Sequence, residues 1–210
     1  SFRTDREASD AAAEPSAPRE KQPQNPGKRA VDVVVASLAL LFLSPALIVV
    51  WALVRATSRG PGLFWTTRVG RNGVHFQMPK FRTMKAFAPV RRREELNDPR
   101  QFDTPIGRTL RVTSVDELPQ LWCVITGDMS LVGPRPVLPS DRTAVERQIL
   151  GCPLIVRPGI TGLAQIRGRN HVSPRRKARY DALYARRSGI LFDVWIKWKT
   201  LVYIIRGKDI

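Results

Sequence analysis

The chain has 210 residues, 43% of them hydrophobic, which is enough for one compact core and too little for two large ones. Its 35 lysines and arginines outnumber the 18 aspartates and glutamates, and the formal net charge of +17 favours a polyanionic partner such as nucleic acid, phosphorylated small molecules or anionic lipid. The two cysteines and two histidines lack the spacing of a disulfide framework or a zinc site, a pattern that is typical of a reducing cytoplasm.

Residues 1–27 are rich in alanine, proline, glutamate and arginine and show no apolar period. Such a segment cannot bury enough surface to offset the entropy lost on ordering, so we expect a disordered N-terminal tail. A charged start, a short apolar run and a small-residue cleavage site do not occur there in that order, so no signal peptide is predicted.

A long apolar segment follows at residues 28–56. Between Ala30 and Val54 the only charged residue is Asp32, and roughly 20 apolar residues are enough to reach across a bilayer. Ser44 and Pro45 lie near the middle of the segment. Proline removes a backbone N–H, and the serine hydroxyl can bond the carbonyl that is left free, so a break in the helix is predicted at this point.

The charges at both ends of this segment indicate how it lies in a membrane. Lys28 and Arg29 precede it, Arg55 and Arg59 follow it, and cationic flanks tend to stay on the cytoplasmic side. Equal positive charge at both ends favours a bent, re-entrant hairpin that enters and leaves on one face, while a true span and a buried soluble helix stay open. Asp32 is then expected at the interface, near Lys28 or Arg29.

Residues 58–84 alternate extended stretches with glycine- and proline-rich turns. The stretches 63–67 and 74–78 flank Asn72 and Gly73, a pair that suits the positive φ angles of a tight turn, so a β-hairpin is predicted. Residues 84–97, with an arginine run at 91–93, are expected to form a polar helix or loop.

The most informative stretch holds two adjacent carboxylates, Asp116 and Glu117, beside a helix start. Pro119 lacks an N–H and is tolerated near the beginning of a helix, so the helix through residues 121–125 should begin close to Ser114 or Asp116. The structural explanation is a capping box, in which Ser114 and Glu117 satisfy free backbone N–H groups. The cationic motifs on both sides favour a functional role instead.

Two helices are predicted towards the C-terminus. Ser173 and Pro174 give an N-cap and first-turn signal for a basic helix to about Arg187, and a Ser-Gly pair ends it. The second helix, over about residues 192–205, has a broad apolar face with tryptophans beside lysines. Such a face suits the headgroup layer of a membrane as well as a protein core, and both placements stay open.

Several motifs occur in one order along the chain. They are Ser44-Pro45, Gly60-Pro61-Gly62 with Arg68-Val69-Gly70, residues 80–84, Arg111 with residues 114–120, residues 127–136, residues 157–162 and residues 168–170. In this combination the chain resembles the bacterial sugar transferases, monotopic phosphoglycosyl transferases that act on polyprenyl phosphate, from Lys28 to near the C-terminus.

The resemblance implies an α+β enzyme with a re-entrant membrane helix hairpin at residues 28–56. A small cytosolic catalytic domain with short strands and amphipathic interfacial C-terminal helices is expected at residues 57–210. The enzyme is expected to be monotopic in the bacterial inner (cytoplasmic) membrane, with the catalytic domain facing the cytoplasm.

The implied reaction moves a sugar 1-phosphate from a nucleotide diphosphate sugar, expected to be a UDP-sugar, to polyprenyl (undecaprenyl) phosphate. It passes through a covalent phosphosugar-aspartate intermediate and releases UMP. This is the first membrane step of exopolysaccharide, capsule, O-antigen or glycoprotein glycan synthesis.

The resemblance also implies roles for individual residues. Asp116 is the expected nucleophile, Glu117 is expected to help with magnesium or local positioning, and both are candidate ligands of Mg²⁺. The residues expected to bind the diphosphate are Lys80, Arg82, Arg111 and Arg135. Arg157, Arg169 and Asp181 are further substrate-binding candidates, with a simple turn at Arg157 and an ion pair of Asp181 within its own helix as the structural alternatives.

Two other functions stay open. Basic clusters at 91–93 and 175–177 could bind nucleic acid, but the apolar segment and the lack of any helix-turn-helix, RNA-recognition or zinc-finger pattern speak against it. A non-catalytic membrane scaffold is the second alternative, and the Asp116-Glu117 pair favours an enzyme over it. The expected partners are a nucleotide diphosphate sugar, polyprenyl phosphate and membrane lipids, without nucleic acid. The sugar, the glycan pathway and the oligomeric state, a homodimer included, are not specified.

Overall fold

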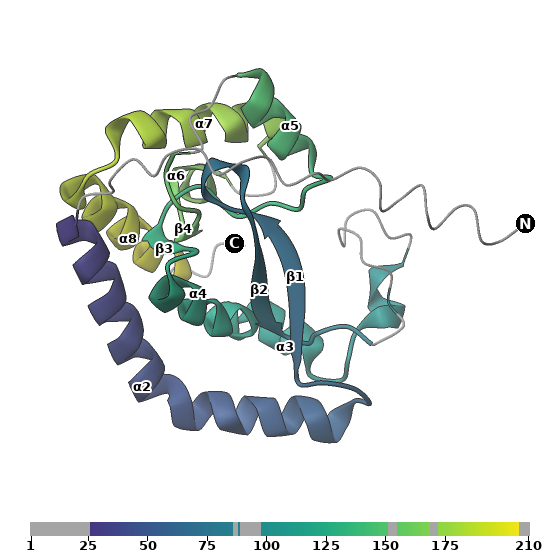
Figure 1. Ribbon diagram of the computed structural model, residues 1–210. Helices are drawn as coiled ribbons and strands as arrows, with labels where there is room; N and C mark the ends of the chain where they lie inside the picture. Colours follow the sequence, from purple (N-terminus) through teal and green to yellow (C-terminus); the bar gives the residue numbers. More distant parts are fainter. Residues whose placement is uncertain (1–25, 86–87, 89–97, 151–154, 169–171, 206–210) are drawn as a thin grey trace, which may run out of the picture.

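The computed structural model describes residues 26–85, 88, 98–150, 155–168 and 172–205. A long N-terminal helix wraps around one side of a body built from short helices and two pairs of strands (Figure 1). The mixed helix and strand content agrees with the predicted α+β class. The disordered tail is predicted for residues 1–27, of which residues 1–25 fall outside the described residues, as does the arginine run at 91–93. Residues 26 and 27 are helical, so the prediction is wrong for these two.

The apolar segment forms one helix, α2 (Pro26–Thr57), which begins two residues before the predicted start. Figure 1 shows α2 bent near its middle into two arms, and Pro45 lies inside the helix. The Ser44 hydroxyl donates to the Leu41 carbonyl at 2.8 Å, the carbonyl that Pro45 cannot bond because it lacks an N–H. The predicted break is therefore a bend within one continuous helix. The re-entrant placement stays a prediction.

Both arms of α2 pack against the body. The first arm contributes buried Ala36 to the main core, and the second contributes Val54 to a smaller cluster with Phe81 and Leu110. Most other apolar side chains of the helix are exposed, among them Phe42 at 78%. By length and composition α2 could cross a membrane, and its exposed apolar face is the surface that a bilayer would cover.

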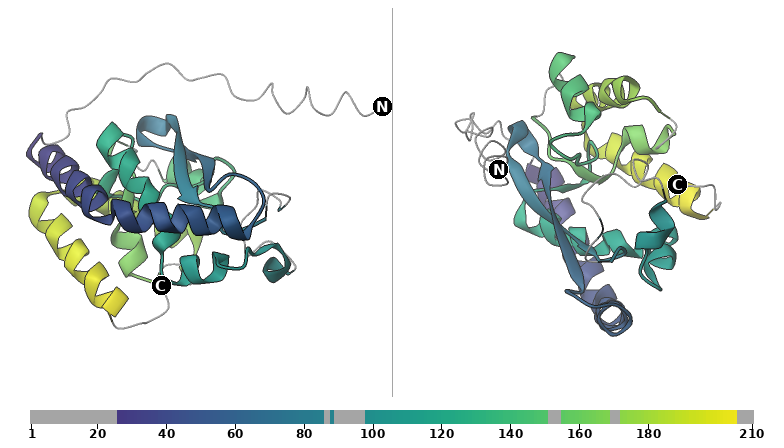
Figure 2. Two further views of the ribbon diagram at one scale, coloured as in Figure 1. Left: turned by 90° about the horizontal axis from the view of Figure 1, so that it is seen from below. Right: turned by 90° about the vertical axis from the view of Figure 1, so that its right-hand side faces the viewer.

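A buried polar network anchors the start of α2 to helix α8 (Ile190–Ile205), and Figure 2 shows the two helix starts side by side. Lys28 forms an ion pair with Asp193 and lies 3.8 Å from Asp32, which accepts a hydrogen bond from the Ser130 hydroxyl at 2.6 Å. The predicted proximity of Asp32 to Lys28 is confirmed. Asp32 lies in the protein interior, with 4% of its surface exposed, and its depth relative to a membrane stays a prediction.

The predicted β-hairpin is confirmed. Strands β1 (Leu63–Val69) and β2 (His75–Phe81) pair antiparallel, and a single 3-10 turn, η1 (Arg71–Gly73), joins them. Asn72 and Gly73 have φ angles of 56° and 79°, as a tight hairpin turn requires.

Within the described part of the following segment lie four short helices: η3 (Pro99–Phe102), α3 (Gly107–Val112), η4 (Val115–Gln120) and α4 (Leu121–Thr126). The predicted helix start near Ser114 is confirmed in position, although its first six residues are 3-10. The capping box is wrong, because Ser114 adopts a left-handed conformation with φ of 57° and its side chain makes no capping hydrogen bond.

Two parallel three-residue strands, β3 (Ser130–Val132) and β4 (Gly159–Thr161), pair beyond α4, and helices α5 (Arg142–Ile149) and α6 (Leu163–Ile166) lie in the segments after them. The backbones meet so closely here that a Cβ on Gly159 would lie 2.0 Å from the Gly133 nitrogen. Glycine in these two motifs therefore lets the loop after β3 pass directly beside β4.

Helix α7 (Pro174–Arg187) begins as predicted, with the Ser173 side chain accepting a hydrogen bond from the Arg176 N–H. Helix α8 follows after Gly189; it buries Ile196 and leaves Trp198 61% exposed. Its interfacial placement stays a prediction.

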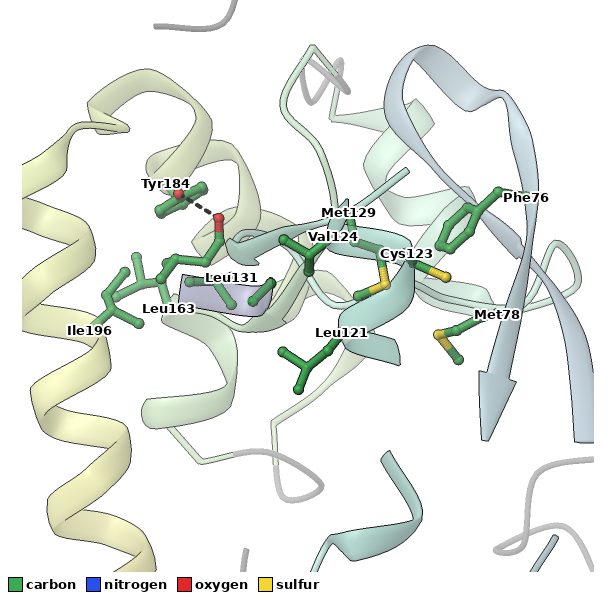
Figure 3. Close-up of a cluster of buried hydrophobic side chains, with 12 residues drawn as sticks. Phe76, Met78, Leu121, Cys123, Val124, Met129, Leu131, Leu163, Tyr184 and Ile196 are labelled. Carbon is green, nitrogen blue, oxygen red and sulfur yellow. Dashed lines mark hydrogen bonds between the residues drawn. The ribbon is translucent and has the colours of Figure 1, made fainter. Parts of the chain in front are cut away.

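The main core joins the hairpin to the C-terminal helices (Figure 3). Phe76 and Met78 of β2 face Cys123 of α4, while Tyr184 of α7 and Ile196 of α8 lie on the other side of the cluster. This core holds β2 against the segment that carries the carboxylate pair.

Candidate active site

Asp116 and Glu117 stand at the start of η4, which packs against β2. Asp116 is almost buried, with 6% of its surface exposed, whereas the Glu117 side chain is 22% exposed. In the part of the chain that the structure describes, the Asp116 carboxylate has no hydrogen-bond or ion-pair partner. The two neighbouring carboxylates therefore lie in different environments.

Glu117 is bound by two cations. Its Oε1 atom accepts hydrogen bonds from Lys80 Nζ at 2.6 Å and from Arg135 Nη2 at 2.8 Å. Burial by itself raises the pKa of Glu117, but the charges of Arg135 and Lys80 and their hydrogen bonds outweigh it and hold that pKa below its usual range. Glu117 therefore stays ionised and holds both cations next to Asp116.

The environment of Asp116 acts on its pKa in the opposite direction. Burial raises the pKa of Asp116 to about 6, because the positive charge of Lys80 only partly offsets the lost hydration and the negative charge of Glu117 adds to it. The charges of Lys80, Arg111 and Arg135 lower this pKa, but burial outweighs them. A carboxyl with this pKa is mostly ionised at neutral pH, and its poorly hydrated oxygens are available to an electrophile.

The backbone of Arg135 is held in place by an ion pair between two neighbouring helices. Its carbonyl accepts a hydrogen bond from Arg147 Nη2 at 2.9 Å, and Arg147 of α5 pairs with Asp181 of α7 at 2.7 Å. The alternative of an ion pair within α7 is therefore wrong, because the partner of Asp181 comes from a different helix. Arg147 is also a residue that the sequence analysis missed, since no motif distinguishes it from the other arginines.

Arg111 lies beside the carboxylate pair without binding it. Its guanidinium donates to the Thr83 hydroxyl at 3.0 Å and pairs with Asp103. Its charge still lowers the pKa of Asp116, which places it within electrostatic reach. The structure thus brings Lys80, Arg111 and Arg135 around the two carboxylates.

The other predicted cations lie elsewhere. Arg82 is buried and donates to the carbonyl and hydroxyl of Ser58 at the end of α2, at 2.8 and 2.7 Å. Arg157 lies towards the start of α2, where burial and then the charge of Arg29 lower its pKa. Arg169 falls outside the described residues. The charges that act on Asp116 come from Lys80, Glu117, Arg111 and Arg135.

The carboxylates offer a limited set of metal ligands. Among the described residues, no group of three or more His, Cys, Asp or Glu side chains could enclose a metal ion. Mg²⁺, however, commonly binds through one or two carboxylates and completes its shell with substrate phosphates and water. The Asp116 carboxylate and the second oxygen of Glu117 fit that kind of binding.

Comparisons with known proteins extend over nearly the whole chain. The family model described as bacterial sugar transferase matches residues 23–207. The exopolysaccharide production protein ExoY of Rhizobium meliloti is 38% identical over 200 residues, which cover 86% of this chain and 87% of that protein.

Two further relatives are longer proteins. The undecaprenyl-phosphate galactose phosphotransferase of Salmonella typhimurium is 37% identical over 85% of this chain, and the UDP-glucose:undecaprenyl-phosphate glucose-1-phosphate transferase of Escherichia coli is 40% identical over 83%. The chain spans only 40% and 39% of their lengths. A family match across the whole described body, with identities of this size, means that the chain belongs to the bacterial sugar transferase family.

Proposed function

We propose that this protein transfers a sugar 1-phosphate from a UDP-sugar to undecaprenyl phosphate, and that Asp116 carries the phosphosugar between the two substrates. The observation that carries the proposal is the buried Asp116 carboxylate, which has no hydrogen-bond partner among the described residues and lies beside a Glu117 that is fixed by Lys80 and Arg135. The names of the relatives from Salmonella typhimurium and Escherichia coli support the two substrate classes.

In the first half of the reaction, an Asp116 oxygen attacks the phosphorus that carries the sugar. The bond from this phosphorus to the bridging oxygen breaks, UMP leaves with that oxygen, and an acyl phosphate forms on Asp116. Lys80 and Arg135 lie where they can stabilise the negative charge on the diphosphate oxygens as it moves to the leaving group.

In the second half, a phosphate oxygen of the lipid attacks the same phosphorus. The bond to Asp116 breaks, the carboxylate is regenerated, and the product is a lipid diphosphate sugar. Asp116 suits both halves because a carboxylate with a pKa near 6 is a competent nucleophile at neutral pH and also a good leaving group.

Magnesium is part of the proposal, with Asp116 and Glu117 as its protein ligands beside the diphosphate. When bound, the ion would neutralise phosphate charge and so ease the approach of one anion to another. Mg²⁺ can be titrated into the Asp116→Asn and Glu117→Gln proteins without substrate, with thermal unfolding as the readout of binding. This measurement tests the two ligands independently of activity.

The protein is proposed to be monotopic in the bacterial inner membrane, with α2 re-entrant and the body in the cytoplasm. The exposed apolar face of α2 and the basic residues at both of its ends support this placement. Labelling of single cysteines placed before and after α2 should find both on the cytoplasmic side. One labelled end on each side would instead mean a true span.

The decisive experiment measures UMP release from a panel of UDP-sugars in the presence of undecaprenyl phosphate and Mg²⁺. Wild type should release UMP from at least one donor and form a lipid diphosphate sugar, and Asp116→Asn should do neither. Near-normal turnover by Asp116→Asn would exclude the covalent mechanism. Because the relatives' names include glucose and galactose, the panel should include both of these donors.

A further inference from the structure

Arg111 differs from the other cations of the candidate active site, because its bonds lead away from the carboxylate pair. Its Nη1 atom donates to the Thr83 hydroxyl at 3.0 Å, and its Nη2 atom pairs with Asp103. The charge of Arg111 nevertheless reaches Asp116, and 23% of the Arg111 side chain is exposed. Arg111 is therefore held by two other residues within electrostatic reach of the proposed nucleophile.

Without these two bonds, Arg111 would be drawn to Asp116. The Asp116 carboxylate is almost buried and has no hydrogen-bond or ion-pair partner among the described residues, and a charge in that state gains most from an opposite charge nearby. An ion pair between the two side chains would occupy the oxygens that must attack phosphorus. Asp103 offers Arg111 a competing carboxylate, and its side chain is only 13% exposed, so water and salt screen their attraction weakly.

The two residues that hold the guanidinium belong to one backbone frame. Asp103 forms an isolated antiparallel bridge with Met84, the residue after Thr83. The Thr104 N–H donates to the Thr83 carbonyl at 3.0 Å, and a Cβ on Gly107 would lie 2.0 Å from the same carbonyl. The loop after β2 and the segment that leads to α3 are therefore locked together, and the two bonds to the guanidinium have anchors that are fixed relative to each other.

The backbone of Arg111 is also fixed relative to Asp116. The Ser114 N–H donates to the Arg111 carbonyl at 3.0 Å, and the Glu117 N–H donates to the Ser114 carbonyl at 3.2 Å. One tight turn, with Ser114 at a φ of 57°, therefore joins the end of α3 to the start of η4. Because this turn holds the two backbones together, the direction of the Arg111 side chain decides whether it meets Asp116 or Asp103.

The bonds to Thr83 and Asp103 leave other N–H groups of the Arg111 guanidinium without a partner among the described residues. Guanidinium groups bind phosphate through several N–H groups at once, so a phosphate beside Asp116 would accept them.

We propose that Asp103 is a positioning residue for phosphoryl transfer. Together with Thr83, it keeps Arg111 off Asp116 in the free protein and presents the remaining N–H groups of Arg111 to the phosphate as it moves onto Asp116. The proposal rests on the proposed function. It adds a residue that lies in none of the motifs found in the sequence.

The first test compares Asp103→Asn with wild type, using the full chain in nanodiscs. Asparagine keeps the size of the side chain and removes its charge, so Arg111 should turn to Asp116. We expect kcat for UMP release to fall about tenfold, the effect of losing one charge-assisted contact, with little change in KM for the UDP-sugar, because the contact serves the phosphate in transit. Asp103→Glu keeps a carboxylate and should lose less. Asp98→Asn is the matched control, because Asp98 lies in the same segment and binds the Arg100 N–H.

A second comparison shows whether Asp103 acts through Arg111. In an Arg111→Gln protein, Asp103→Asn should cause no further loss of kcat, since the cation that it controls is gone. Thr83→Val keeps the shape of its side chain and removes the other bond, so it should give a smaller loss, again only when Arg111 is present; it serves the same comparison where Asp103→Asn does not fold. Equal losses with and without Arg111 would mean a merely structural role and overturn the proposal. An unchanged kcat in Asp103→Asn, or a change confined to KM, would overturn it as well.

A structure of the Asp103→Asn protein gives a readout that does not depend on turnover. Its Arg111 guanidinium should lie within hydrogen-bonding distance of the Asp116 carboxylate. A guanidinium that stays on Thr83 and away from Asp116 would overturn the proposal. No UMP release from wild type would contradict the proposed function, and the structure of the variant would still decide whether Asp103 keeps Arg111 off Asp116.

Discussion

Arg147 and Asp181 form an ion pair that is almost wholly buried between α5 and α7, with 4% and 3% of their side-chain surfaces exposed. The same Arg147 guanidinium donates to the Arg135 carbonyl at 2.9 Å. Helix α7 is thereby linked to the loop that places Arg135 on Glu117. The pair is a positioning element for the candidate active site, because neither member contacts Glu117 or Asp116 itself.

Asp181→Asn should destabilise the protein and weaken donor turnover together. It leaves Arg147 buried without its counter-charge, which costs about 3–5 kcal/mol. The double variant Arg147→Met with Asp181→Leu replaces both charges by apolar groups and should recover much of the stability, but it removes the hydrogen bond from Arg147 to the Arg135 carbonyl. Thermal unfolding and kcat/KM for the UDP-sugar separate the two effects. Full recovery of activity in the double variant would contradict a positioning role for the pair.

Asp116→Asn should make the folded protein more stable at neutral pH. The pKa of Asp116 is 3.8 in its reference state and about 6 when folded. As the pH rises from about 4 to about 6, Asp116 loses its proton in the unfolded chain before it does so in the folded protein. The free energy of unfolding therefore falls over this pH range, by about 3 kcal/mol in total. The asparagine variant lacks this loss. Its unfolding temperature should exceed that of wild type at pH 7.5 and match it near pH 4; an equal difference at both pH values would contradict the assignment.

Lys80→Met should move the acid limb of the pH dependence of UMP release to higher pH. The charge of Lys80 lowers the pKa of Asp116, so its loss raises that pKa further above its present value of about 6. A shift of about one pH unit is the expected size for an adjacent cation. Lys85→Met is the matched control, because Lys85 donates to the Gln101 carbonyl. A limb that stays in place in Lys80→Met would mean that another group controls it.

Replacing Ser44 and Pro45 together by alanine should straighten α2. Alanine at position 45 restores the N–H that the Leu41 carbonyl lacks, and the bend loses its cause. Spin labels at the exposed positions 34 and 53 should then report a longer and broader distance distribution. Ser44→Ala alone keeps the proline and should keep the wild-type distance. An unchanged distance in the double variant would show that packing against the body, and not Pro45, sets the bend.

Local patterns in the sequence predict much of this structure. The turn at Asn72 and Gly73, the cap at Ser173 and the bond from Ser44 each depend on neighbouring residues, and all three are present. The capping box fails because Glu117 pairs with Lys80, which is 37 positions away along the chain. A local pattern cannot reveal that the stronger partner comes from a distant strand.

The candidate site, like the fold, is predicted by motifs in part and depends for the rest on contacts between distant residues. The motifs identify Asp116, Glu117, Lys80 and Arg135, which the fold brings together. They do not separate Arg82 from this group, although its guanidinium turns to the end of α2. Positive charge along the sequence favours an anionic partner. The packing of β2 between α2 and η4 decides that Lys80 faces the carboxylates and that Arg82 does not.

The charged start of α2 limits how freely this helix can be exchanged between proteins. Lys28 and Asp32 complete a set of buried groups with Ser130, Tyr184 and Asp193, so the helix is also part of the folded interior. A chimaera carrying a generic apolar anchor in place of α2 would leave Asp193 and Ser130 without those partners in a dry environment. The anchor and the body therefore form a single unit for grafting, truncation or family-wide recombination.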